Sequence, residues 1–182
     1  MKKNFLIIIL FISVLLLGNN ERLKEYIYNF NNYTINEIND LLYTFKNIDL
    51  NNDLKIIHGS LLIKKSIHEW FLPLKYYYIY SGMLEMKEVV NNDFDNLLYR
   101  YIRGKTVFDI IEYDISKEIF INDFEYIYIR VDKDFKDNFD FGEVLFKLAK
   151  VYEKKNKKRM ENLLNELKNY KNSFYYGLIY DE

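Results

Sequence analysis

The chain of 182 residues is long enough for one domain of ordinary size, and its 26 lysines and arginines nearly balance its 27 aspartates and glutamates. This balance leaves neither a basic stripe for nucleic acid nor an acidic tail, so no nucleic-acid partner is expected. Cysteine is absent, which excludes thiol catalysis, cysteine-ligated metals and disulfide bonds, and the fold must therefore rest on its hydrophobic core.

The first eighteen residues have the layout of a targeting segment. Lys2 and Lys3 precede an apolar run over residues 5–17, and Gly18 follows it. A helix of this length spans roughly 20 Å, less than the ~30 Å hydrocarbon core of a bilayer, so a cleaved signal peptide is favoured over an N-terminal anchor. We therefore expect export to the periplasm, the cell envelope or the extracellular space, with residues 19–182 forming a single helical domain.

The remaining chain predicts helices, because apolar residues recur every three or four positions between polar clusters. Thr34 and Glu37 have the spacing of a capping box, which predicts that a helix over 35–45 begins there. Asn52 or Asp53 is expected to cap the helix that follows.

The middle of the chain predicts two longer helices. Pro73 stands where the first turn of a helix tolerates proline, and a helix over 74–90 is expected after it. Asp93 or Asp95 is expected to cap a further helix over 96–111.

Helices are also expected in the last third of the chain. Ser116 is expected to cap a helix over 117–129. Residues 124–131 alternate in the manner of a strand, but we favour a helix because a lone strand would have no partner. The acidic residues of 132–143 predict a solvated loop that caps the next helix, and calcium binding by this loop is the less favoured alternative.

Three small residues recur at one spacing. Gly59, Gly104 and Ala149 are 45 residues apart, and each lies in the middle of a predicted helix between apolar neighbours. A small residue in such a place allows a second helix to approach the backbone closely. The spacing therefore predicts repeated helical hairpins.

The sequence around the second of these residues resembles a tetratricopeptide (TPR) repeat. Residues 82–106 are similar to the junction between helix B of one repeat and helix A of the next. Val89 matches the small packing position of helix B, residues 93–96 match the Asp-Pro-x-Asn turn, and Gly104 matches the small residue of helix A. Phe94 departs from the pattern because it replaces the proline of the turn.

A second match lies near the C-terminus. Leu148, Ala149 and Tyr152 match the core of another helix A, and Asn156 takes the place of the glycine at the turn to helix B. The resemblance covers roughly residues 50–170 and is closest to exported bacterial proteins with degenerate repeats. It implies an all-α fold of stacked antiparallel hairpins, either a TPR-like α-solenoid or a compact helical bundle.

The resemblance also implies a concave groove lined by helix A side chains. The residues that fall on these positions, besides Ser60, are Lys64, Tyr101, Lys105, Asp109, Lys150 and Lys154. Because a lysine recurs in all three repeats, the groove suits an acidic peptide, a carboxyl terminus or an anionic polymer. We therefore expect a non-catalytic interaction or scaffolding protein of the cell envelope that binds a protein or peptide partner. Membrane contact is expected only through the N-terminal segment, if it is not cleaved.

Two motifs resemble catalytic or binding signatures without completing them. Residues 104–106 match the end of a phosphate-binding loop, but Tyr99 stands where that loop needs a glycine. His58 and His68 lack the spacing of a zinc-protease helix and predict structural or surface histidines. No catalytic residue, metal ligand or cofactor is therefore expected, and the chain is not expected to be an enzyme.

One alternative stays open. Tyr76, Tyr77, Tyr78 and Tyr80 cannot all face inward from one helix, and exposed tyrosine suits sugar and peptide recognition. The alternative is therefore that the chain is an envelope protein that uses this tyrosine-rich helix and the acidic loop either to bind a small ligand or glycan or to act as an enzyme.

Overall fold

The computed structural model describes residues 19–180, and the predicted targeting segment lies outside them. These residues form ten helices and no strand, which confirms the all-α prediction. No helix among them is long and apolar enough to span a bilayer. The chain divides after Ile110 into two compact units, here called the N-terminal unit and the C-terminal unit. The single domain expected over residues 19–182 stays a prediction.

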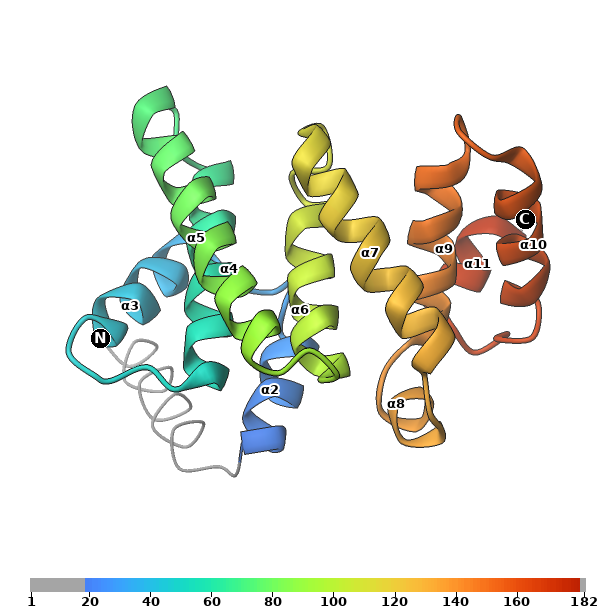
Figure 1. Ribbon diagram of the computed structural model, residues 1–182, viewed down its shortest axis with the longest axis horizontal. Coiled ribbons are helices and arrows are strands. Elements are labelled where there is room, and N and C mark those ends of the chain that lie inside the picture. Colours follow the sequence, from blue (N-terminus) through green and yellow to red (C-terminus); the bar gives the residue numbers. More distant parts are fainter. Residues whose placement is uncertain (1–18, 181–182) are drawn as a thin grey trace. The chain divides into compact units, whose positions relative to one another are not determined.

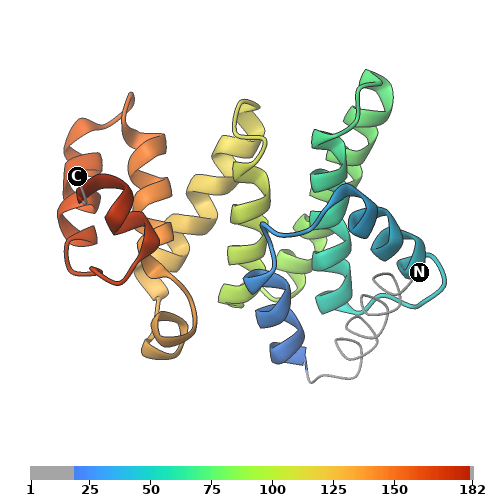
Figure 2. The same ribbon diagram turned by 180° about the vertical axis from the view of Figure 1, so that it is seen from behind.

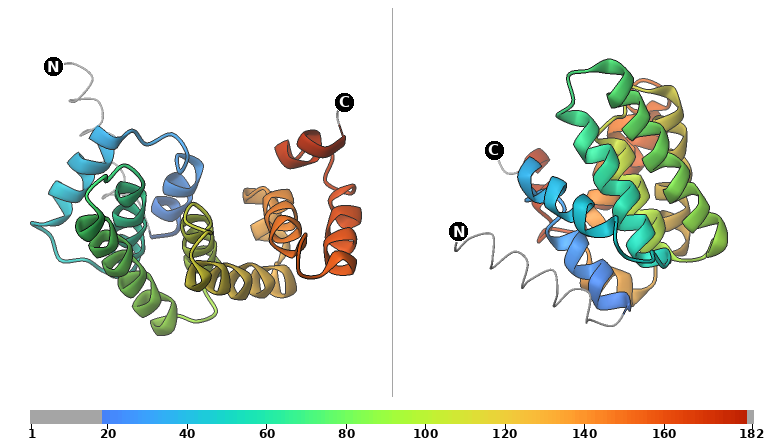
Figure 3. Two further views of the ribbon diagram at one scale, coloured as in Figure 1. Left: turned by 90° about the horizontal axis from the view of Figure 1, so that it is seen from above. Right: turned by 90° about the vertical axis from the view of Figure 1, so that its left-hand side faces the viewer.

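The N-terminal unit is built around a long helical hairpin. Its helices are α2 (Asn19–Tyr28), α3 (Ile35–Phe45), α4 (Asn52–Ile67), α5 (Leu72–Asn92) and α6 (Leu97–Phe108) (Figure 1). Helices α4 and α5 lie side by side along their length (Figure 3), and α2, α3 and α6 pack against α4. Helix α4 is therefore the centre of this unit.

The C-terminal unit contains a second hairpin. Its helices are α7 (Asp114–Arg130), α8 (Lys133–Asn138), α9 (Phe141–Tyr152), α10 (Lys157–Leu167) and α11 (Phe174–Tyr180). Helices α9 and α10 form the hairpin, with α7 against α9 and α11 lying across the pair (Figure 2). Because α7 continues to Arg130, the helix favoured for residues 124–131 is confirmed up to that residue.

Two predicted helix starts are confirmed. The Thr34 backbone N–H donates to Glu37 Oε2 at 2.7 Å, and the Glu37 N–H donates to Thr34 Oγ1 at 3.4 Å, which completes the capping box of α3. Pro73 lies in the first turn of α5. The lysine-rich turn between α9 and α10 ends at Asn156, whose side chain caps α10 by accepting from the Arg159 N–H.

Other predicted caps are wrong by a few residues. Asn51, not Asn52 or Asp53, caps α4, and Asn96, not Asp93 or Asp95, caps α6. In both cases an asparagine oxygen reaches N–H groups two or three residues ahead, as a cap requires. Helix α7 begins before Ser116, whose side chain is instead buried within its first turn.

The acidic segment 132–143 is more ordered than the predicted solvated loop. It contains α8, and the rings of Phe135 and Phe139 are buried. Asp140 caps α9 as predicted, since its Oδ1 accepts from the Gly142 N–H at 2.9 Å. The aromatic residues between the acids explain the difference, because burying them folds the segment against its unit.

A pair of glycines joins α4 to α5. A Cβ atom at Gly59 would lie 2.8 Å from the Gly82 carbonyl oxygen, and a Cβ atom at Gly82 would overlap the Gly59 carbonyl oxygen. The two helix backbones are therefore in contact at this point. The close approach predicted for Gly59 is confirmed, with Gly82 as its partner.

Candidate binding faces

The structure brings together the four predicted groove residues of the N-terminal unit. Lys64 comes from α4, and Tyr101, Lys105 and Asp109 come from α6 and its C-terminal end. Lys64 Nζ lies 3.6 Å from Asp109 Oδ2, and Lys105 Nζ lies 5.2 Å from the centroid of the Tyr101 ring. These residues form a continuous surface, which we call the N-terminal face.

The chain's own helix α2 and the residues after it cover the N-terminal face. Phe30 is 1% exposed, and its ring centroid lies 3.7 Å from Lys64 Nζ and 5.2 Å from Lys105 Nζ. A ring whose centroid lies within about 6 Å of two ammonium groups gains cation–π attraction from both. The two lysines therefore face a segment of the same chain in this structure, and an acidic partner could reach them only if that segment moved.

Hydroxyl groups connect α2 to the same face. The Tyr26 hydroxyl donates to Ser60 Oγ at 2.7 Å, and Ser60 Oγ lies 2.5 Å from Thr106 Oγ1. The Thr106 hydroxyl also contacts the Ile102 carbonyl oxygen at 2.7 Å. Burial raises the pKa of the Tyr26 hydroxyl well above its usual value, so the phenol stays neutral and can donate. The network links α2, α4 and α6.

Lys150 and Lys154 belong to the C-terminal unit. Both are exposed, Lys150 on the last turn of α9 and Lys154 in the turn that follows. Lys150 Nζ lies 5.7 Å from the ring centroid of Phe146, one turn earlier on the helix. Phe146 and Lys150 occupy the same positions relative to Ala149 that Tyr101 and Lys105 occupy relative to Gly104. We call this surface of α9 the C-terminal face.

Helix α11 covers the C-terminal face. The Tyr175 ring centroid lies 5.1 Å from that of Phe146, and the Tyr180 hydroxyl donates to the Leu164 carbonyl oxygen at 2.9 Å. Ile179 also lines a cavity of about 80 Å³ with Ala149, Lys150 and other residues of α9 and α10. The face and its cover are therefore incompletely packed.

The two covering helices are held differently. In α2, Leu23, Tyr26 and Ile27 are all buried, as is Phe30 just after it. In α11 none of the seven residues is buried, although all seven are described. Since burial is the main stabilising contribution to such contacts, α11 is the more easily displaced of the two.

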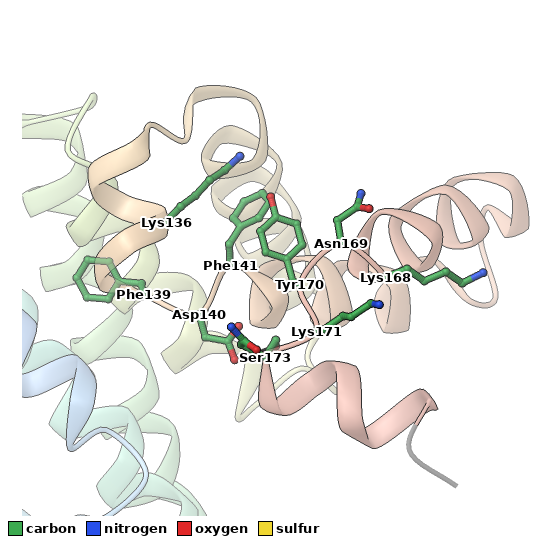
Figure 4. Close-up of a pocket in the computed structure, with 10 residues that line it drawn as sticks. Lys136, Phe139, Asp140, Phe141, Lys168, Asn169, Tyr170, Lys171 and Ser173 are labelled. Carbon is green, nitrogen blue, oxygen red and sulfur yellow. Dashed lines mark hydrogen bonds between the residues drawn. The ribbon is translucent and has the colours of Figure 1, made fainter.

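A larger cavity of about 670 Å³ opens elsewhere in the C-terminal unit (Figure 4). The rings of Phe141 and Tyr170 lie side by side at its centre, and Lys136 Nζ lies 4.9 Å from the Phe141 centroid. Lys168 and Lys171 also line it but extend away from the two rings in Figure 4. The lysines do not converge, so the cavity lacks the arrangement that would hold an anion.

The four tyrosines of the alternative function differ in their exposure to solvent. Tyr76, Tyr77 and Tyr80 are exposed on α5, whereas Tyr78 is half-buried beneath Lys65. Within residues 19–180 no three histidine or acidic side chains lie close enough together to hold a metal ion. The small-ligand or glycan function stays a prediction.

The histidines differ in their surroundings. His58 Nδ1 lies 2.7 Å from Glu85 Oε2 on α5, and its ring packs edge-on against Phe45. His68 ends α4 and is exposed. These placements agree with the structural and surface histidines predicted.

Sequence reasoning missed three features. Gly82 was not recognised as the partner of Gly59, although a glycine within a predicted helix is a signal for close packing. The covering roles of α2 and α11 had no local signal, because pattern alone does not say which distant segment covers a face. Trp70, at 87% exposed, could have been noticed beside the tyrosine-rich helix.

The chain matches no protein-family model, no curated protein and no solved structure.

Proposed function

We propose that the chain is a non-catalytic, TPR-like protein that binds a helical segment of an acidic partner protein outside the cytoplasm. The 45-residue spacing of Gly59, Gly104 and Ala149, all buried in α4, α6 and α9, supports a repeat of this kind. The backbone contact between Gly59 and Gly82 supports close packing of the two helices of one hairpin.

The observation that favours binding is the similar covering of the two faces. In each unit a short helix or the residue just after it places an aromatic ring against the face. Phe30, two residues after α2, lies near Lys64 and Lys105, and Tyr175 of α11 packs against Phe146 beside Lys150. A helix that lays an aromatic anchor on a helical surface is a common form of peptide recognition. The chain's own helices thus indicate the kind of ligand that these faces accept.

The C-terminal face is where we expect the partner to bind. Helix α11 has no buried side chain, so an external segment with better anchors can replace it. A covering helix in the same chain acts at an effective concentration in the millimolar range, which the partner must overcome. This competition weakens binding to the intact chain and makes it depend on how firmly α11 is held.

The charges around this face favour an acidic partner. Lys150 and Lys154 are exposed. Three further exposed lysines follow, Lys155 in the turn and Lys157 and Lys158 at the start of α10. Exposed ion pairs contribute only about 0.2–1 kcal/mol each, so the lysines select and orient the partner while its aromatic side chains supply most of the affinity.

A peptide titration tests this proposal. The probe is a fluorescent peptide with the sequence of residues 172–182, titrated with the intact chain and with a Tyr175→Ala, Ile179→Ala double variant. If the two substitutions weaken the chain's own α11 by about 1.4 kcal/mol, the peptide binds the double variant roughly tenfold more tightly. Equal and negligible binding to both proteins would contradict the proposal.

Charge variants then test the acidic preference. In the double-variant background, Lys150→Glu and Lys154→Glu should weaken binding of the peptide, which ends in Asp181 and Glu182. Lys133→Glu is the matched control because Lys133 is also exposed but lies on α8. Equal losses from all three substitutions would show that the lysines beside the C-terminal face have no special role.

A further inference from the structure

The turn between α4 and α5, together with the adjoining residues of both helices, carries half of the large exposed apolar and aromatic side chains of the described residues. Within residues 21–180 sixteen large apolar or aromatic side chains are exposed, and eight of them lie between Ile67 and Leu84. Trp70, Phe71 and Leu72 are consecutive, with exposed fractions of 87%, 51% and 60%. We call these three residues the hairpin tip, and in Figure 1 they lie at the outer end of the N-terminal unit.

Three exposed tyrosines of α5 lie behind the hairpin tip. Tyr76, Tyr77 and Tyr80 are more than half exposed and lie four to eight residues after Leu72, about 6–12 Å along the helix. Apolar residues at an extremity with tyrosines behind them match the order of a bilayer surface, where tyrosine and tryptophan lie at the level of the headgroups.

The charges near the hairpin tip suit an anionic surface. Glu69 is the only acidic residue between residues 54 and 84, and its Oε1 accepts from the Phe71 backbone N–H at 3.0 Å. Lys65 and Lys75 flank the tip, with Lys65 Nζ 4.9 Å from the Tyr78 ring centroid. The one carboxylate is thus engaged with the backbone, while the Lys65 ammonium lies over a tyrosine ring and Lys75 adds a second positive charge three residues after Leu72.

We propose that the hairpin tip binds the surface of an anionic lipid bilayer, inserting Trp70, Phe71 and Leu72 to the level of the acyl chains. Lys65 and Lys75 then lie among the lipid phosphates, and the tyrosines of α5 lie at headgroup depth. This contact is independent of the peptide-binding function and of the N-terminal segment.

Trp70 is the only tryptophan, so its fluorescence reports the hairpin tip alone, whatever residues 1–18 do. The full chain is mixed with vesicles of phosphatidylcholine, with or without about one third phosphatidylglycerol. On the anionic vesicles we expect a blue shift of Trp70 emission and quenching by brominated acyl chains. Lys75→Ala should weaken this association about fivefold, since one lysine near an anionic surface contributes ~1 kcal/mol.

Leu72→Asp provides the second test, because an exposed aspartate in the tip opposes insertion without disturbing the core. It should abolish the shift of Trp70 emission on the anionic vesicles. Ile129→Asp is the matched control, since Ile129 is 71% exposed on α7, and it should leave the shift unchanged. Unshifted and unquenched Trp70 emission would overturn the proposal, even if the protein sediments with the vesicles. Such a result would leave a protein partner as the occupant of this surface.

Discussion

Replacing Gly82 by alanine tests the contact that joins α4 to α5. The new Cβ atom would overlap the Gly59 carbonyl oxygen and lie 2.8 Å from Ile63 Cγ1, so the two backbones would have to separate. Overpacking of this kind costs about 1–3 kcal/mol, and we expect the upper value because one obstacle is backbone. Alanine regains about 1 kcal/mol of helix propensity over glycine. The expected net loss in the free energy of unfolding is therefore about 2 kcal/mol.

Urea denaturation followed by helical circular dichroism measures this loss directly. In a thermal scan it corresponds to a fall in Tm of about 4–8 °C for a chain of this size. Ser81→Ala is the matched control, since it lies one residue away on α5, is half-buried, and should leave stability unchanged or slightly raised. A Gly82→Ala variant as stable as the unsubstituted chain would refute the close helix contact and, with it, the main structural support for a TPR-like hairpin.

Three further substitutions test contacts within the units. Phe30→Ala should lower the free energy of unfolding by about 3–5 kcal/mol, because it empties a buried ring site, and urea denaturation would detect it. Burial raises the pKa of Tyr26, so the folded state keeps its phenol proton while the unfolded state loses it above pH ~10. Stability should then fall with rising pH by about 1.4 kcal/mol per pH unit for this group, and Tyr26→Phe should remove that part of the slope. Arg159 donates to both oxygens of Glu125, at 3.1 and 2.6 Å, so Arg159→Lys should cost about 1 kcal/mol by losing the two-point geometry; an unchanged urea midpoint would contradict this.

Local features of the fold could be predicted from the sequence because they depend on near neighbours. The capping box of Thr34 and Glu37 and the place of Pro73 involve residues within one turn of each other. The predicted cap of α4 was wrong by one residue. Asn51, Asn52 and Asp53 are consecutive, and the side chain of any of them can accept from the first N–H groups of a helix.

The binding faces could be predicted only in part, because covering is a property of the tertiary fold. The register of Gly59 and Gly104 predicts Lys64 and Lys105 on one surface, and the ammonium groups of both lie near the Phe30 ring. Nothing in the local pattern around Phe30 says that its ring lies within reach of both lysines. When a segment covers a face that is distant in the sequence, the segment's own residue pattern does not show which face it covers.

The most direct test of the binding proposal is hydrogen–deuterium exchange of the two covering helices. We predict that backbone N–H groups of α11 exchange nearly as fast as those of an isolated peptide, and that those of α2 are protected as strongly as those of α4. This result would mean that the C-terminal face is available to a partner while the N-terminal face is permanently filled. Equal, strong protection of α11 and α2 would contradict the account, since neither face could then accept an external helix.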